Sequence, residues 1–510
     1  MAQNWKRARA DERITKRLEE VKNPEVIDYT REKSLDGIST NRAYRVNGAH
    51  LYLDILNISD MLAVTDKEGS ECHKRTLRFL NLHYRAVARV LDECDSTRVD
   101  MANQRLHAVV AKPYDSADNA ECTRVHRAVA IAQLLIDVLA ETGDTDEKIP
   151  MARVRAGIDC GFALAVNNGR RGAREPLFLG QPANRAAKRA AGGAGNGIFL
   201  TNDARKAIGL KALAETALDS SPLAKEEVAA SQKVANLNVN KDGILRDWKE
   251  DLKNNPIGKF EFSGHTPPYC DLDVDTLSAS NSRRNDAMSI FADIDGFTSY
   301  VRKHIEEKPE DVVRALHVLR SELDAALDQD LWGIKIRFIG DCIHGLVVEG
   351  TAQTTDIEKT ISTAIIAAGA MRSSFNLGLQ RLEKEGIDIG GLGLAIGLEF
   401  GSMTATRLGV KGALVRCSVS RGVLGCEAEQ KRCGGVETAI GSTAYESGND
   451  AVRALFSDER IVANLDYDAA VEGLSNDGDK TARKMLEEAV LYVVPAQAAA
   501  IARPVRAHAQ

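Results

Sequence analysis

Apolar residues in the second half of the chain alternate between strand-like and helix-like spacing. Residues 287–294 (AMSIFADI) form a short apolar run that is typical of a buried strand. Pro309 opens a segment whose apolar residues are three or four positions apart, which predicts a helix. The residues of this stripe are Val312, Leu316, Leu319, Leu323 and Leu327.

The next segment has the pattern of a hairpin. Residues 334–348 (IKIRFIGDCIHGLVV) alternate apolar and polar positions, turn at Gly340 and Asp341, and alternate again. A second apolar stripe, Ile357, Ile361 and Ile365, predicts a helix that leads to a strand at 393–401 (GLAIGLEFG). The order strand, helix, hairpin, helix, strand is the ferredoxin-like βαββαβ arrangement, so we expect an α+β fold.

The chain repeats this pattern once. Motifs in the first half recur 237 to 240 residues later and in the same order, which indicates two homologous domains. The repeated pairs are Asp54 and Asp293, His107 and His344, Gly157 and Gly397, and Gly197 and Gly435. We predict a charged helical lead-in (1–39), a first domain (40–215), a connector (216–284), a second domain (285–495) and a tail (496–510).

Composition narrows the class of protein. Of 510 residues, 44% are hydrophobic and 27% are charged, which is ordinary for a globular chain. The formal net charge of −6 provides no overall positive field for nucleic acid. The nine cysteines include no C-x-x-C pair. Without an apolar leader or an apolar run of about 18 residues, we expect a cytoplasmic protein with no membrane or nucleic-acid partner.

Two aspartates are the strongest candidates for chemistry. Asp293 ends a predicted strand, and Asp341 lies at the tip of the neighbouring hairpin. Both side chains then emerge at the same end of one sheet, and carboxylate and carbonyl oxygens are the ligands that Mg²⁺ and Mn²⁺ prefer. Gly296 follows in the same motif and lets backbone N–H groups approach phosphate oxygens. Either aspartate alone is also a common turn residue.

The motifs FADIDGFT and FIGD resemble the class III nucleotide cyclase catalytic domain. The stretches RAYRVNGAHLYLDILN and VRCSVSRGVLGCEAEQ are most similar to the pyrimidine cyclases of the bacterial Pycsar anti-phage system. This resemblance covers both halves. It implies two tandem cyclase domains that form an intramolecular pseudo-dimer, in which one domain supplies the metal aspartates and the other an Asn and a basic residue.

The resemblance assigns the two roles to different halves. Asp293, Asp341 and the backbone carbonyl of Ile294 match the ligands of two divalent ions, Mn²⁺ or Mg²⁺. In the first half Asp54 matches, but the second ligand position falls on Gln104.

In LGQPANRAAKRAA, Asn184 and Lys188 match the transition-state pair and lie one helical turn apart. The second half offers Gly422 and Cys426 at those positions, so we expect one complete site and one degenerate site. Lys188 stands where the family usually has Arg, and Arg189 is a neighbour that could compensate. A phosphate-contacting Arg is replaced by Ala395 in the second half, whereas Arg155 holds that place in the first.

Base reading is expected at Arg337, with Gly296, Phe297 and Thr298 as further substrate contacts. Arg337 stands where adenylate cyclases carry Lys and guanylate cyclases Glu, and the cooperating Asp falls on Leu177. An arginine only donates hydrogen bonds, which suits the carbonyls of uracil or cytosine and opposes the adenine amino group. Guanine also presents acceptors. The resemblance therefore implies a cyclase of UTP or CTP in antiviral defence, and we favour UTP.

Three other interpretations fit parts of the sequence. They are a guanylate or adenylate cyclase of ordinary signalling, a silent nucleotide-binding pseudocyclase, and a polymerase-like palm domain. The intact pair of Asp293 and Asp341 disfavours a pseudocyclase, and the acidic net charge disfavours a palm domain. The resemblance implies a nucleoside triphosphate as substrate and an effector that responds to the cyclic product. A further homo-oligomer stays open.

Overall fold

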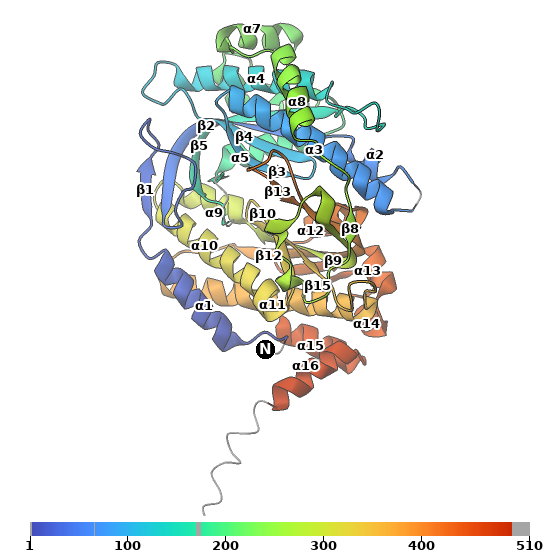
Figure 1. The fold of residues 1–510 in the computed structure, drawn as a ribbon. Helices are drawn as coiled ribbons and strands as arrows, with labels where there is room; N and C mark the ends of the chain where they lie inside the picture. The colour runs from blue at the N-terminus through green and yellow to red at the C-terminus, as the bar shows by residue number, and fades with distance from the viewer. Residues whose placement is uncertain (1–2, 66, 170–174, 492–510) are drawn as a thin grey trace, which may run out of the picture.

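The computed structural model describes residues 3–65, 67–169 and 175–491 (Figure 1). The first half contains a sheet in the order β3-β4-β2-β5-β6, with β1 pairing β2 and β7 pairing β5. Its strands are β1 (Glu25–Asp28), β2 (Arg42–Ile55), β3 (Thr97–Ala102), β4 (Arg105–Val110), β5 (Val154–Asn167), β6 (Pro176–Leu179) and β7 (Gly197–Leu200). Its helices are α2 (Ile58–Leu62), α3 (Ser70–Glu93), α4 (Ala120–Leu139), α5 (Gln181–Ala191) and α6 (Asn202–Ala207).

The second half contains a sheet in the order β10-β11-β9-β12-β14-β15, with β13 pairing β12 and β8 pairing β9. Its strands are β8 (Phe262–Ser263), β9 (Ser282–Asp295), β10 (Ile334–Ile339), β11 (Cys342–Val347), β12 (Gly393–Leu408), β13 (Val415–Cys417), β14 (Glu437–Ile440) and β15 (Ile461–Ala463). Its helices are α9 (Phe297–His304), α10 (Pro309–Ala325), α11 (Ile357–Lys384), α12 (Arg421–Lys431), α13 (Ser442–Ser447), α14 (Asp450–Phe456), α15 (Tyr467–Asn476) and α16 (Lys480–Leu491).

The four inner strands have the same order in both sheets. β3-β4-β2-β5 corresponds to β10-β11-β9-β12, and in each half helices fall between the strands as the βαββαβ arrangement requires. The α+β architecture expected from the sequence is confirmed. The predicted tail 496–510 lies outside the described residues.

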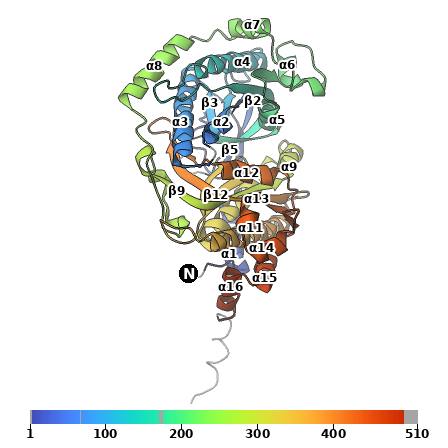
Figure 2. The ribbon, with the colours of Figure 1, turned by 90° about the vertical axis from the view of Figure 1, so that its right-hand side faces the viewer.

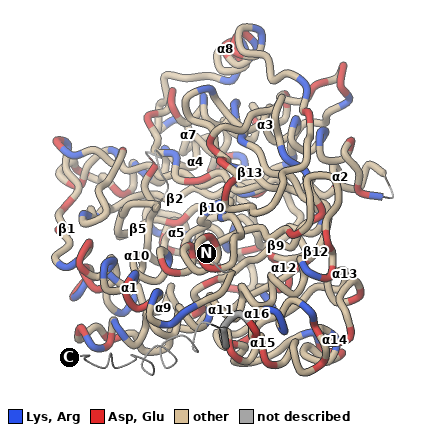
Figure 3. The backbone as a smooth tube through the Cα atoms, turned by 60° about the horizontal axis from the view of Figure 1, so that its bottom comes forward, with Lys and Arg blue, Asp and Glu red and all other residues tan. Residues whose placement is uncertain are grey.

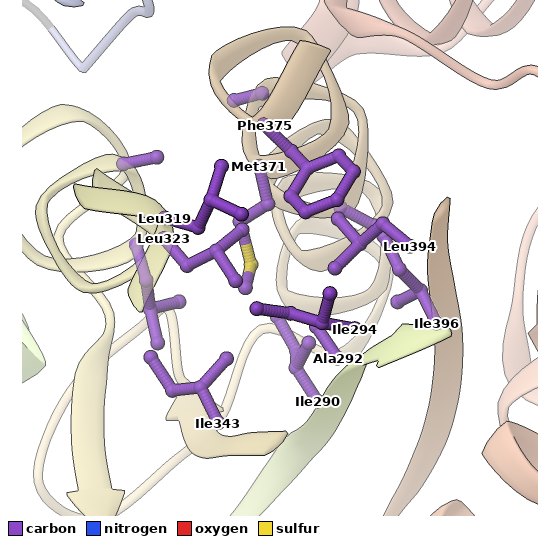
Figure 4. Close-up of a cluster of buried hydrophobic side chains, with 14 of the residues drawn as sticks. Ile290, Ala292, Ile294, Leu319, Leu323, Ile343, Met371, Phe375, Leu394 and Ile396 are labelled. Carbon is purple, nitrogen blue, oxygen red and sulfur yellow. The ribbon is translucent and has the colours of Figure 1, made fainter. Parts of the chain in front are cut away.

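The core of the second half follows the predicted stripes. The helix α10 begins at Pro309, and Leu319 and Leu323 of its stripe are buried against the sheet. Figure 4 shows these two leucines facing Met371 and Phe375 of α11 above the inner strands. Ile357 departs from its stripe because it is the first residue of α11 and is 40% exposed.

Two segments outside the predicted domains contain helices that pack on one of the halves: the lead-in helix packs on the second half, and the connector helices pack on the first half, which they follow. The lead-in helix α1 (Arg7–Glu20) lies on α10 and α11 of the second half, and buries Ala10, Ile14 and Leu18 there. The connector contains α7 (Lys225–Ala235) and α8 (Lys241–Asn254), which pack on α3 and α4 of the first half. Figures 1 and 2 show α1 among the yellow and orange helices and α8 beside the blue α3. Each half is therefore covered by a helix that precedes the other half.

Buried polar contacts fix both of these helices. Arg13 of α1 donates to Glu322 and to Asp330, whose Oδ1 accepts from Nη1 at 3.0 Å. Trp248 of α8 donates from its indole to the carbonyl of Leu82 at 3.1 Å. Such bonds satisfy groups that burial would otherwise leave unpaired.

The described surface carries both signs of charge. Figure 3 shows lysines and arginines interspersed with aspartates and glutamates along most of the backbone. Among the described residues, we find no helix with the length and apolar character needed to cross a bilayer.

Candidate active site

The two predicted metal aspartates lie at neighbouring strand ends. Asp293 is on β9 opposite Ala395 of β12, and β11 pairs with β9 through Ile343 and Ala292. Asp341 follows Gly340, which takes a left-handed φ of 64° at the tip of the β10-β11 hairpin. This turn brings Asp341 to the strand end that carries Asp293 and Ile294, as the sequence predicted.

Burial and mutual repulsion set the electrostatics of this pair. Burial, with the charge of Asp295 in addition, raises the pKa of Asp293 to about 6. Burial and then the charge of Asp293 raise the pKa of Asp341 well above its ordinary value. Two carboxylates held this way favour a bound cation, because a cation removes their repulsion.

The donor set fits divalent metal ions. The described residues contain no cluster of three or more His, Cys, Asp or Glu side chains suited to a metal. Mg²⁺ is nevertheless commonly held by one or two carboxylates, with substrate phosphates and water completing its shell. Asp293, Asp341 and the backbone carbonyl of Ile294 are the residues that would hold metal here.

A tight turn connects β9 to α9. Gly296 has a φ of 80°, and a Cβ there would lie 2.4 Å from the carbonyl oxygen of Gly391, so this position requires glycine. Phe297 is buried at the start of α9, whereas Thr298 is exposed. Both line a cavity between the two halves of the chain.

Asn184 reaches this cavity from the other half. Its Nδ2 donates to Oγ1 of Thr298 at 2.7 Å. The helix α5, which carries Asn184, lies directly on β5, since a Cβ at Gly157 would be 2.1 Å from the carbonyl oxygen of Ala186. Asn184 is thus brought to the half that carries Asp293 and Asp341.

Residues of both halves line this interface cavity, whose volume is about 90 Å³. From the first half, the polar residues in its wall are Tyr52, Asp100, Arg105, His107, Asn168 and Asn184, and Leu177 also lines it. From the second half, the wall includes Phe297, Thr298, Arg320, Phe338 and Asp341. Lys188, one turn after Asn184, is exposed and is not in this wall.

Arg337 lies behind the wall of the interface cavity and is not part of its lining. The guanidinium donates to the carboxylate of Asp100 and to the carbonyl of Met101. It also donates to the carbonyl of Arg416 at 3.1 Å. Asp100, its ion-pair partner, is the residue that lines the cavity.

Sequence motifs alone did not place Asp100, Tyr52 or Arg320 in this site. Arg320 is buried on the apolar side of α10, where its guanidinium stacks 3.8 Å above the ring of Phe338 and donates to the carbonyl of Asn168 at 2.8 Å. The one available signal was an arginine placed four residues after Leu316 on an otherwise apolar face.

Comparisons with known proteins agree with this geometry. Residues 280–413 match the family described as the adenylate and guanylate cyclase catalytic domain. The chain is 53% identical over 489 residues to a uridylate cyclase of Pseudomonas aeruginosa, covering 96% of this chain and 95% of that protein. A uridylate cyclase of a Rhizobium species is 40% identical over 436 residues, covering 82% of both. The chain belongs to the class III nucleotide cyclase family.

A solved structure supports the same family. It is described as a class III adenylyl cyclase-like ATP-binding protein from Pseudomonas aeruginosa. Its TM-score is 0.91 at 53% identity, with 93% of this chain and 100% of that chain covered. The match therefore extends over both halves of this cyclase.

The first half contains a position equivalent to the site of Asp293 and Asp341, but it carries different side chains. Asp54 occupies the strand position of Asp293, and Gln104 falls in the β3-β4 turn. Arg105 pairs with Glu427 of α12 at 2.6 Å, and Lys431 pairs with the same carboxylate at 2.7 Å. An ion-paired arginine thus stands beside Asp54, where the first site has a pair of carboxylates.

The structure corrects the alignment of α12 with α5. A Cβ at Gly157 would meet Ala186, and a Cβ at the equivalent Gly397 would meet the carbonyl oxygen of Cys426 at 2.4 Å. Cys426 therefore matches Ala186, and the positions equivalent to Asn184 and Lys188 are Leu424 and Ala428 instead of Gly422 and Cys426. Since neither Leu424 nor Ala428 has a polar side chain, this half still lacks the pair.

Two arginines that the sequence placed near the phosphates are engaged elsewhere in the cyclase. Arg155 is buried, donates to the carbonyls of Arg189 and Asp219 and stacks on Phe199. Arg189 pairs with Asp219 at 3.3 Å. Neither lines the interface cavity.

Proposed function

We propose that this cyclase converts UTP to cyclic 3′,5′-UMP and pyrophosphate at the interface cavity. The observation that carries the proposal is the bond between Asn184 and Thr298, which joins an asparagine of one half to the half that bears Asp293 and Asp341. Its close relatives named uridylate cyclase support the base assignment.

In the proposed reaction, the ribose 3′-hydroxyl attacks the α-phosphorus and pyrophosphate leaves. Asp293 and Asp341, with the carbonyl of Ile294, would hold two divalent ions that lower the pKa of the hydroxyl and neutralise the triphosphate. Asn184 orients the ribose. Lys188 stabilises the charge that develops on the α-phosphate.

The turn after β9 positions the triphosphate in this mechanism. Gly296 lets the chain turn tightly from β9 into α9, because its missing side chain leaves room for the backbone of Gly391. Phe297 closes the buried side of the cavity, and Thr298 holds Asn184 in place through its hydroxyl.

The two halves would then act as an intramolecular pseudo-dimer with one working site. The four inner strands repeat in order, and each half contributes a different set of catalytic groups. At the equivalent position of the first half, the ion pairs of Arg105, Glu427 and Lys431 stand beside Asp54, and Gln104 replaces the second carboxylate of a metal pair.

The experiment that tests the proposal is product identification. The purified full chain is incubated with each of the four ribonucleoside triphosphates and Mn²⁺, and the cyclic product is separated and identified. Cyclic UMP as the main product supports the proposal. A preference for ATP, which the name of the solved relative suggests, would overturn it in favour of an adenylate cyclase. No product with any triphosphate would favour a silent pseudocyclase.

Arg337 is expected to act on the base through Asp100. Removing the guanidinium in Arg337→Ala takes away one of the groups that hold the Asp100 carboxylate in the cavity wall. We expect kcat/KM to fall roughly 5- to 150-fold for UTP, and less for the other triphosphates, because only the cognate base loses a directed bond. The measurement is kcat/KM for all four triphosphates. An equal loss for all four would assign Arg337 to the phosphates or to structure.

A cellular role follows from the same assignment. The product would be a second messenger read by an effector that binds cyclic nucleotides. We propose antiviral defence in the cytoplasm of bacteria as the context, on the basis of the Pycsar resemblance.

A further inference from the structure

Three side chains form a row across the first sheet and line the interface cavity. Asp100 of β3 is the register partner of His107 of β4, which is the partner of Tyr52 of β2. Cross-strand partners share a face of the sheet and lie about 5 Å apart. The rings of Tyr52 and His107 stack with centroids 4.0 Å apart, so the imidazole is held in a fixed orientation.

The far side of His107 contacts a second histidine. Its Nε2 lies 3.2 Å from Nδ1 of His50, and both imidazoles are buried. Because His50 occupies Nε2, the Nδ1 atom is the one with which His107 can meet a molecule in the cavity.

Burial fixes how many protons the two imidazoles carry. Burial lowers the pKa of His50 to about 3, and it lowers the pKa of His107 well below its usual value. Both rings are therefore neutral in ordinary buffers, and each has one N–H. One proton lies between the two rings, and the other lies on an outer nitrogen.

The surroundings of His50 decide which outer nitrogen carries this proton. Nε2 of His50 is buried and has no hydrogen-bond partner among the described residues. A buried N–H without an acceptor is rarer than a buried acceptor without a donor. The favoured arrangement has Nδ1–H of His50 donating to His107, which leaves the proton of His107 on Nδ1.

We propose that His107 is a specificity-determining residue that donates from Nδ1–H to O4 of uracil, beside Asp100, which accepts from N3–H. This inference rests on the proposed uridylate cyclase function and extends it to the base-reading groups. A donor next to an acceptor is the complement of the uracil edge at positions 4 and 3.

The donor of His107 and the acceptor of Asp100 do not match the hydrogen-bonding groups of cytosine. Cytosine carries an amino donor at position 4 and an acceptor at position 3. The N–H of His107 would then face another donor, and the carboxylate of Asp100 would face another acceptor. Adenine presents the same unfavourable order at N6 and N1. Guanine presents a carbonyl at position 6 and an N–H at N1, which is the same order as in uracil. On hydrogen bonding alone, His107 and Asp100 therefore accept GTP better than ATP or CTP.

The second half provides a matched control. His344 stacks on Phe291 with centroids 4.3 Å apart, and its Nε2 lies 3.1 Å from Oγ of Ser289. His344 and Ser289 do not line the interface cavity. The two halves therefore contain equivalent histidine contacts, only one of which borders the proposed base site.

The test compares kcat/KM for UTP and CTP in the full chain and three variants. His107→Gln offers an amide that can present either a carbonyl or an amino group, so the preference for UTP over CTP should fall at least about 10-fold. His50→Ser introduces the residue found at the equivalent position, Ser289. Its hydroxyl accepts as well as donates, so the proton of His107 is no longer confined to Nδ1 and the preference should fall in the same direction. Ser289→Ala should leave the ratio unchanged.

The outcomes separate this inference from the function on which it rests. A wild-type protein that makes no cyclic UMP contradicts the proposed function itself. A wild type that prefers UTP, with His107→Gln and His50→Ser variants that keep the same UTP to CTP ratio, overturns the base-reading role of His107. An equal loss for UTP and CTP in both variants also overturns it, because that result indicates a structural role.

Discussion

Cyclase activity is expected to disappear when Asp341 is replaced by asparagine, with kcat falling by about 10³-fold or more. The substitution removes one charged ligand from the proposed metal site, and metal ions supply several kcal/mol of stabilisation to developing charge. Asp293→Asn should have the same effect. The measurement is turnover of UTP with saturating Mn²⁺. Near wild-type turnover in either variant would contradict the cyclase mechanism.

The fold should survive these substitutions, which makes the loss of activity interpretable. The pKa of Asp293 is raised by burial to about 6, above the value of about 3.9 in an unfolded chain, so its ionisation destabilises the metal-free fold. Stability from this group is present at low pH and is lost as the pH rises through about 6. Thermal melting in EDTA at a pH of about 8 should therefore show Asp293→Asn to be at least as stable as the wild type.

The second large effect is expected at Asn184. Asn184→Ala should raise the barrier by about 2 kcal/mol or more, roughly 30-fold in kcat, because the ribose loses an oriented polar partner. The binding of UTP should change less than kcat. Single-turnover measurements separate the two.

Asp54→Asn provides the matched control, because Asp54 stands at the strand position of Asp293 in the other half. It should be tolerated, since its neighbours are Gln104 and the ion-paired Arg105. If Asp54→Asn is as harmful as Asp293→Asn, the assignment of a single working site is wrong.

Local motifs allowed the core of the site to be predicted. Asp293 and Asp341 belong to a strand and a hairpin whose patterns are contained in a few residues, so their meeting point follows from the sequence. Asn184 could be placed because it lies on a short helix with a recognisable motif. The βαββαβ order was predictable for the same reason.

Contacts between the halves could not be predicted from these patterns. Arg337 lies behind Asp100 because β10 and β3, which are equivalent strands of the two halves, come together at the interface. The spacing of residues within either half does not predict this contact. The match between α12 and α5 was shifted by two residues, since small side chains leave the register undefined until Gly397 packs against Cys426. The charged lead-in was predicted to be helical, but the sequence does not indicate which half its helix α1 covers.

The docking of α1 on the second half also sets an order of events during synthesis. Arg13 leaves the ribosome more than 300 residues before its partners Glu322 and Asp330. At roughly 5–20 residues per second, α1 waits on the order of 15 s to a minute for its docking surface. An incomplete chain lacks the surface on which α1 docks and, until Asp341 has emerged, a complete metal site. A chain that terminates before Asp341 therefore contains no complete metal site.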